Sequence, residues 1–136
     1  MALLEKYLEV KESTIPNAGK GLFTTVFIEK GTRIVEYKGR ITTWKDVEYD
    51  STNFYIYTVN PKHVIDAKRT LKAWARYAND ARGLKRIKGV TNNCHFLNDG
   101  LRVYIESGKN IPAGSELLVD YGKAYWDVIR QNLKAT

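Results

Sequence analysis

The amino-acid sequence predicts a compact, mostly β domain. Short segments rich in Val, Ile, Thr and Tyr recur along the chain, and glycine-containing turns separate them. Few segments show the periodicity of a helix, and 136 residues is the length of one domain. A hydrophobic fraction of 43% can supply a core, whereas no apolar run approaches the roughly 20 residues that cross a bilayer. We therefore expect a single domain over residues 1–136 that makes no membrane contact.

The predicted strands rest on alternation and on composition. Leu8 and Val10 alternate with polar neighbours, and so do Leu101, Val103 and Ile105. The remaining strands are short β-branched or aromatic runs beside turn residues. In chain order, the predicted strands are Tyr7–Lys11, Thr32–Tyr37, Lys38–Thr42, Phe54–Val59, His63–Ala67, Leu101–Ile105 and Glu116–Val119. Turn signals fall between them at Asn17-Ala18-Gly19, Lys30-Gly31, Asn98-Asp99-Gly100 and Pro112-Ala113-Gly114.

Two helices complete the prediction. After Thr70, which suits a helix N-cap, apolar residues recur at i, i+3, i+4 and i+7. These residues are Leu71, Trp74, Ala75 and Ala78. They predict one short central helix. A weaker amphipathic pattern from Tyr125 to Leu133 predicts a C-terminal helix, which we place at residues 127–136.

Cysteine and charge narrow the function classes. The lone Cys94 excludes an internal disulfide and a cysteine-cluster zinc site, and with only His63 and His95 we expect no metal. The net charge of +7 is concentrated in residues 62–88, which carry nine Lys and Arg against two Asp. Such a basic segment can bind nucleic acid, and it can equally be a solvated face.

Four short patterns could carry chemistry, and each also has an ordinary structural explanation. Gly19-Lys20-Gly21 allows a ligand close to the backbone, although a lone Gly-x-Gly is more often a tight turn. Asn79 can both donate and accept hydrogen bonds, or it can end a helix. The adjacent Asn92 and Asn93 are typical of a loop, and a Tyr such as Tyr121 is usually a packing residue.

The order of these patterns resembles the SET-domain family of protein lysine methyltransferases, over about residues 9–126. The matching segments share both sequence and order with the family. Gly19–Phe23 resembles the opening Gly-x-Gly segment, Glu36–Gly39 the Tyr-x-Gly turn, Ile65–Ala67 the Ile-Asp-Ala segment, Arg76–Asp80 the Arg-Phe-x-Asn-His segment, Asn93-Cys94 the second Asn, and Ile111–Gly122 the closing Glu-Leu-x-x-Asp-Tyr-Gly motif.

The resemblance implies a fold and a cofactor. The fold would be several small curved sheets with a knot-like core, into which the chain threads the Asn-containing segment and the closing Tyr motif. S-adenosylmethionine would be the methyl donor and S-adenosylhomocysteine the product, with no metal. The implied cofactor-binding residues are Lys20, Gly21, Leu22, Asn79, Asp80 and Trp126.

The resemblance also implies an activity, methyl transfer to the ε-amine of a lysine in a histone-like or other protein. Tyr121 would be the catalytic tyrosine, which orients the lysine rather than acting as a strong base. The implied substrate channel consists of Tyr37, Tyr57, Phe96, Val119 and Tyr121. Phe96 and Val119 occupy the two positions where a tyrosine hydroxyl restricts members of the family to one methyl group. Neither supplies a hydroxyl, so we expect di- or trimethylation.

The chain departs from the family pattern in one region. Asp80 stands where the family has His, Asn92 stands in the place of Pro, and a basic insertion of residues 82–91 separates the two Asn motifs. These departures support an alternative, a catalytically inactive SET-like module that binds nucleic acid through residues 62–88. The sequence also leaves open a homodimer in which the second copy completes the site. Either function would be intracellular, in the cytoplasm or associated with the nucleus or nucleoid.

Overall fold

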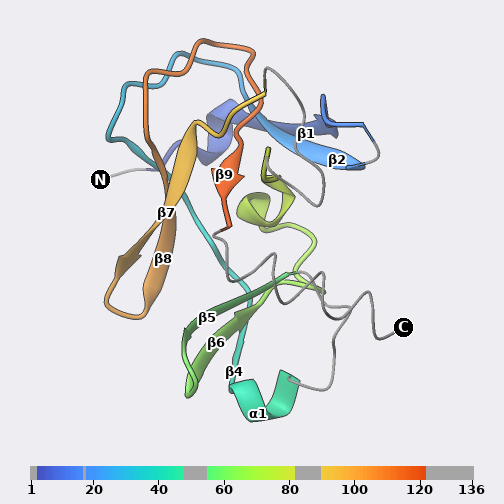
Figure 1. Ribbon diagram of the computed structural model, residues 1–136, viewed down its shortest axis with the longest axis vertical. Coiled ribbons are helices and arrows are strands. Elements are labelled where there is room, and N and C mark those ends of the chain that lie inside the picture. The colour runs from blue at the N-terminus through green and yellow to red at the C-terminus, as the bar shows by residue number, and fades with distance from the viewer. Residues whose placement is uncertain (1–2, 17, 48–54, 82–89, 122–136) are drawn as a thin grey trace.

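The computed structural model describes residues 3–16, 18–47, 55–81 and 90–121. Across these ranges the chain forms three small sheets and a few very short helices (Figure 1). The helices are η1 (Glu5–Tyr7) and η2 (Trp74–Tyr77), which are 3-10 turns, and α1 (Trp44–Val47). The mostly β prediction is therefore confirmed.

The first sheet places the glycine segment beside the closing motif. β1 (Leu8–Glu12) pairs antiparallel with β2 (Lys20–Thr24). On the other edge of β2, Phe23 forms an isolated antiparallel bridge with Glu116, and the N–H of Leu117 donates to the carbonyl oxygen of Leu22 at 2.7 Å. Because β2 is covered on both edges, its residues from Gly21 onward are buried.

The second sheet has the strand order β3-β8-β7-β9. The hairpin of β7 (Cys94–Asp99) and β8 (Arg102–Ser107) turns at the predicted Gly100 signal, and β3 (Arg33–Glu36) pairs antiparallel with β8. β9 (Val119–Asp120) is parallel to β7. β7 is a strand that the sequence did not predict, and the predicted strand at 116–119 begins only at Val119.

The third sheet has the order β4-β6-β5, with β4 (Arg40–Thr42), β6 (His63–Asp66) and β5 (Ile56–Asn60) all antiparallel. Gly39 precedes this sheet, at the corner that the sequence predicted. A Cβ at this position would lie 2.5 Å from the carbonyl oxygen of Asp66, so only glycine allows the two backbones to approach so closely.

The predicted central helix is reduced to the single turn of η2. Leu71 is 64% exposed, and the N-cap of η2 is Ala73 without a side-chain hydrogen bond, so Thr70 does not cap it. The side chains of Arg76 and Tyr77 donate hydrogen bonds to backbone carbonyl oxygens of the residues that precede them. Arg76 donates to the carbonyl oxygens of Ala67 and Lys68, and the Tyr77 hydroxyl donates to Leu71. These contacts hold the segment as turns. The predicted helix at 125–133 lies outside the described residues.

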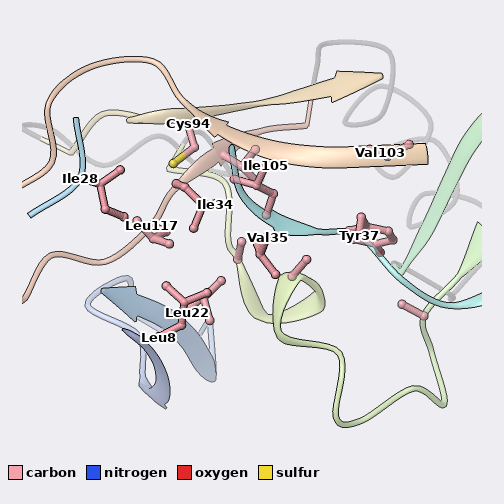
Figure 2. Close-up of a cluster of buried hydrophobic side chains, with 14 of the residues drawn as sticks. Leu8, Leu22, Ile28, Ile34, Val35, Tyr37, Cys94, Val103, Ile105 and Leu117 are labelled. Atoms are coloured by element: carbon pink, nitrogen blue, oxygen red, sulfur yellow. The ribbon is translucent and has the colours of Figure 1, made fainter. Parts of the chain in front are cut away.

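The core lies where the first two sheets meet η2. In Figure 2, Leu8 and Leu22 extend from the first sheet toward Ile34, Val35 and Leu117. On the other side Ile105 and Cys94 pack from β8 and β7. Ala75 and Ala78 of the η2 region also belong to this cluster, so the small helix is anchored by small side chains.

The closing segment is held between the two Asn-containing segments. Leu118 forms a parallel bridge with Asn79, and the N–H of Val119 donates to the carbonyl oxygen of Asn79 at 2.8 Å. On the opposite side, Asn93 receives a hydrogen bond from the N–H of Leu118 and donates one to the carbonyl oxygen of Glu116, both at 2.9 Å. This arrangement agrees with the threaded core that the resemblance implied.

No helix among the described residues is long and apolar enough to cross a bilayer. Within the same part of the chain, His, Cys, Asp and Glu side chains form no group of three or more that could hold a metal ion.

Candidate active site

A narrow cavity of about 50 Å³ opens between the second and third sheets and η2. It is lined by Tyr37, Tyr55, Ile56, Tyr57, Ala75, Arg76, Ala78, Phe96 and Tyr121. Of the predicted channel residues, Tyr37, Tyr57, Phe96 and Tyr121 come together here from separate segments. Val119 is not among the residues that line the cavity, and its side chain is fully buried.

The predicted channel residues form a cluster of aromatic rings. The ring centre of Phe96 lies 5.0 Å from that of Tyr57, 5.9 Å from that of Tyr37 and 6.2 Å from that of Tyr121. The first two pairs meet edge to face and the third is stacked. Such a cluster of rings offers an apolar surface that suits the methylene stem of a long amine side chain.

The hydroxyl groups of three of the four tyrosines that line the cavity donate hydrogen bonds to the protein. Tyr37 donates to the carbonyl oxygen of Tyr55 at 2.8 Å, Tyr57 to Oδ1 of Asn98 at 2.7 Å, and Tyr121 to the carbonyl oxygen of Ala78. A hydroxyl whose proton is directed at the protein turns its lone pairs toward other donors, such as an amine. Burial raises the pKa of Tyr57, and its bond with Asn98 only partly offsets this, so Tyr57 stays neutral.

Arg76 contributes a wall of the cavity that sequence reasoning missed. Its guanidinium carbon lies 4.2 Å from the ring centre of Tyr55 and 5.0 Å from that of Tyr77. Its Nε and Nη2 donate to the carbonyl oxygens of Ala67 and Lys68 at 2.9 and 3.0 Å. Arg76 belongs to the Arg76–Asp80 motif, but the motif alone does not show which residues the guanidinium contacts, because the fold brings those partners to it.

A second cluster lies beside the cavity, at the glycine segment. The side-chain Nδ2 of Asn79 donates to the carbonyl oxygen of Lys20 at 2.9 Å, so two predicted cofactor-binding residues meet directly. Gly21 follows in β2. Leu22 packs its side chain in the core, and its carbonyl oxygen accepts the N–H of Leu117. Trp126 lies outside the described residues.

Glu116 organises this second cluster and was not singled out from the sequence. Its carboxylate accepts hydrogen bonds from Oγ of Ser13 at 2.7 Å and from both the N–H and Oγ1 of Thr14, at 2.9 and 2.6 Å. Nδ2 of Asn79 approaches the same carboxylate at 3.4 Å. An open depression of about 590 Å³ adjoins it, lined by Glu12, Ser13, Thr14, Ile15, Pro16 and Gly19.

Asp80 joins the two Asn-containing segments to Tyr121. The residue is only 4% exposed, and its carboxylate accepts the backbone N–H of Tyr121 at 2.9 Å and Nδ2 of Asn92 at 2.8 Å. The resemblance places the backbone around Asp80 beside the cofactor, and this stays a prediction. The Asp80 carboxylate makes hydrogen bonds within the chain.

Comparison with known proteins agrees with this geometry. Residues 19–122 match the sequence profile of the SET domain, which is more than half of the chain. The chain therefore belongs to the SET-domain family, as the six ordered motifs predicted.

Two curated relatives show the nature of the match. The chain is 32% identical over 118 residues to the histone-lysine N-methyltransferase set-17 of Caenorhabditis elegans, across 85% of this chain and 41% of that protein. It is 30% identical over 109 residues to human PR domain zinc finger protein 14, across 77% of this chain and 18% of that protein. The chain thus spans less than half the length of these relatives.

A solved structure also matches over most of the chain. The methyltransferase domain of human PR domain-containing protein 2 has a TM-score of 0.65 and 26% sequence identity with it. The match covers 85% of this chain and 77% of that one. The small sheets described above are therefore those of a SET domain.

Proposed function

We propose that this chain transfers a methyl group from S-adenosylmethionine to the ε-amine of a lysine in a protein. The observation that carries the proposal is the position of two consecutive residues. Ala78 lines the aromatic cavity, while the side chain of Asn79 bonds Lys20 in the glycine segment. A lysine in the cavity and a methyl donor at the glycine segment would therefore be neighbours. Relatives that are named as lysine methyltransferases, among them set-17, support the same activity.

The donors and acceptors at the glycine segment fit the amino-acid end of S-adenosylmethionine. The carbonyl oxygen of Lys20 can accept a hydrogen bond, and the side-chain amide of Asn79 can both accept and donate one. Oδ1 of Asn79 receives no hydrogen bond from the described residues. Gly21 and Leu22 would contribute backbone only, and so would Asp80, whose backbone would meet the adenine while its carboxylate bonds Asn92 and Tyr121. Trp126, which lies outside the described residues, would help to close the cofactor pocket. When bound, the cofactor supplies an electrophilic methyl group on a sulfonium.

The cavity would favour the neutral form of the substrate lysine. With an ordinary pKa of about 10.4, roughly one lysine in 10³ is neutral at pH 7. Removal from water into the ring cluster of Tyr37, Tyr57 and Phe96 disfavours the charged form, and the fixed charge of Arg76 acts in the same direction. Both effects lower the pKa of the lysine, so more of it is nucleophilic.

Tyr121 would align the nucleophile. Its hydroxyl donates to the carbonyl oxygen of Ala78, so it is fixed at the wall that separates the cavity from Asn79. A neutral phenol is a poor base, so orientation and electrostatic support are its contribution. Alignment of the two reactants can supply much of the rate enhancement in such a transfer.

The number of methyl groups transferred is a further proposal. Phe96 lines the cavity without a hydroxyl, and Val119 is fully buried and also carries none, so we propose di- or trimethylation. Mass spectrometry that found only monomethyl-lysine at long reaction times would contradict this.

Calorimetric titration with S-adenosylmethionine tests the proposed function without knowledge of the substrate. Saturable binding that Asn79→Ala weakens about tenfold or more is expected, because the variant removes the amide that faces Lys20. Asn110→Ala is the matched control, since the Asn110 side chain accepts the N–H of Lys30 in a turn elsewhere. A protein that binds no S-adenosylmethionine, alone or with lysine peptides, would contradict the proposal.

Nucleic-acid binding through residues 62–88 and a homodimer stay separate predictions. Lys62, Lys68, Arg69 and Lys72 are described, whereas Arg82, Lys85, Arg86 and Lys88 lie outside the described residues. The segment can be tested by duplex-DNA titration at two salt concentrations, because phosphate contacts weaken steeply with salt.

A further inference from the structure

The backbone of Tyr121 is held by a side chain rather than by a sheet. The parallel pairing of β7 with β9 ends at His95 and Asp120, so the N–H of Tyr121 lies just beyond the last ladder pair. The buried carboxylate of Asp80 accepts this N–H at 2.9 Å through Oδ2. Such a charge-assisted bond to a backbone amide is stronger than a neutral one.

Asn92 holds Asp80 in the orientation that this contact requires. Its Nδ2 donates to Oδ1 of Asp80 at 2.8 Å, and its Oδ1 accepts the N–H of Ala81 at 2.7 Å. An ionised carboxylate only accepts and a backbone N–H only donates, so the Asn92 amide satisfies both in one orientation alone. The two residues therefore act as one unit, which we call the Asp80–Asn92 clamp.

With the Asp80–Asn92 clamp, both the backbone N–H and the side-chain hydroxyl of Tyr121 are hydrogen-bonded. Its hydroxyl donates to the carbonyl oxygen of Ala78, and its N–H donates to Asp80. Between these, the N–H of Val119 donates to the carbonyl oxygen of Asn79. Three consecutive residues, 78–80, thus fix the hydroxyl, the backbone and the preceding strand.

We propose that Asp80 and Asn92 are positioning residues for Tyr121, which set the place of its hydroxyl in the cavity. This inference rests on the proposed function, in which that hydroxyl orients the substrate lysine. The departures from the family pattern at 80 and 92 are then a single coupled exchange. A His and a Pro at these two positions could not reproduce the bonds, because Pro has no side-chain amide to offer.

An exchange of the two side chains tests the clamp. Asp80→Asn leaves two amide donors facing one another or leaves the N–H of Tyr121 without an acceptor. Asn92→Asp alone places two carboxylates together. The double variant Asp80→Asn/Asn92→Asp can restore every bond, since the amide now at position 80 would donate to the carboxylate now at position 92 and still accept from Tyr121. It also conserves charge and volume, so the pair of variants controls for folding.

The expected result is a selective loss of turnover. Asp80→Asn should lower kcat by about ten- to a hundredfold, as expected when a reacting group is displaced by about an ångström or less. The calorimetric Kd for S-adenosylmethionine should change by less than about threefold. The double variant should recover most of the lost kcat. A wild-type kcat in Asp80→Asn, or a double variant no better than the weaker single one, would overturn the proposal.

A second background separates positioning from general stability. In Tyr121→Phe, where the hydroxyl is absent, Asp80→Asn should cause little further loss of kcat, because the group it positions is gone. A full additional loss would assign Asp80 a purely structural role and overturn the proposal.

Hydrogen exchange keeps this test distinct from a failure of the proposed function. If the wild-type protein transfers no methyl group, the backbone amide of Tyr121 still reports the clamp. Faster exchange of that amide in Asp80→Asn, restored in the double variant, supports the clamp in an inactive protein. Unchanged exchange overturns it.

Discussion

Gly21 lies directly against the carboxylate of Glu116. A Cβ at position 21 would overlap Oε2 of Glu116, and it would lie 3.0 Å from Cδ of that residue and 3.2 Å from Cα of Ser13. The same carboxylate receives the hydrogen bonds of Ser13 and Thr14. Glycine at 21 therefore allows the N-terminal segment, β2 and the closing motif to meet at one buried acid.

Gly21→Ala is expected to reduce stability and cofactor binding together. The added methyl group must displace either the Glu116 carboxylate or the Ser13 backbone, at a cost of about 1–3 kcal/mol in the free energy of unfolding. The displaced carboxylate also loses its approach to Asn79. Chemical denaturation and calorimetry with S-adenosylmethionine measure the two effects.

Gly108→Ala is the matched control for that variant. Its added Cβ would come closest to Nδ1 of the His95 side chain, at 3.3 Å, outside the glycine segment. It should lose less stability and keep wild-type cofactor affinity. Equal losses of stability and of cofactor affinity in the two variants would contradict the importance of the Gly21–Glu116 contact for both.

Tyr121→Phe is expected to lower the rate of methyl transfer by about a hundredfold, since an oriented hydroxyl in a dry site contributes on this scale. S-adenosylmethionine affinity should change little, because the ring and its stacking on Phe96 remain. Tyr77→Phe is a close control, as it also removes a hydroxyl that donates to a backbone carbonyl, that of Leu71, outside the cavity. Steady-state turnover that drops equally in both variants would argue against the role of Tyr121.

Phe96→Tyr is expected to shift the product toward monomethyl-lysine. The Phe96 ring packs at 5.0 Å from Tyr57 in the cavity, so an added hydroxyl would take space and bond the amine or a water there. A methylated amine would then reorient less readily for a second transfer. Mass spectrometry of the product over time gives the answer, with Phe27→Tyr, an exposed ring, as control. An unchanged product distribution would refute the expectation.

Cys94 should make folding stability depend on alkaline pH. Burial raises the pKa of its thiol from 9.0 to about 12. The unfolded chain therefore loses this proton above pH 9 while the folded chain keeps it until about pH 12. The contribution of the Cys94 thiol to the free energy of unfolding is therefore complete below pH 9, and it falls by about 1.4 kcal/mol for each pH unit above that.

Guanidinium unfolding between about pH 8 and about pH 10.5 would reveal the difference in slope. Cys94→Ala loses a constant amount of stability through its cavity, but its stability should decline less steeply with pH. Tyr57, whose pKa is also raised by burial, contributes equally to both proteins and cancels. Parallel curves for the two proteins would contradict the assignment.

The sequence predicted most strands because their alternation and turn residues are local signals. It missed the strand that begins at Cys94, since the preceding Asn92 and Asn93 are typical of loops. The structure gives both Asn side chains non-local partners, in Asp80 and in the closing segment. The helix expected after Thr70 failed for a similar reason. Its periodicity was real, but side-chain bonds from Arg76 and Tyr77 hold that segment in turns.

The candidate site followed from the family resemblance more than from any one residue. Tyr37, Tyr57, Phe96 and Tyr121 are distant in sequence and share no local signal, yet they line one cavity. Glu116 belongs to the closing motif at Ile111–Gly122, but its role depends on hydrogen bonds from Ser13 and Thr14, which lie about a hundred residues earlier in the chain. Local patterns cannot show such partners.

The short parallel strand β9 has a consequence for solubility as well. β9 pairs with one edge of β7, at Cys94 and His95, and β8 pairs with the other edge of β7 (Figure 1). Release of Val119 and Asp120 would expose an unpaired strand edge, and exposed edges recruit strands from other molecules. We therefore expect Val119 and Asp120, which directly precede Tyr121, to reduce aggregation as well. Variants that loosen this pairing should precipitate on warming before they unfold completely.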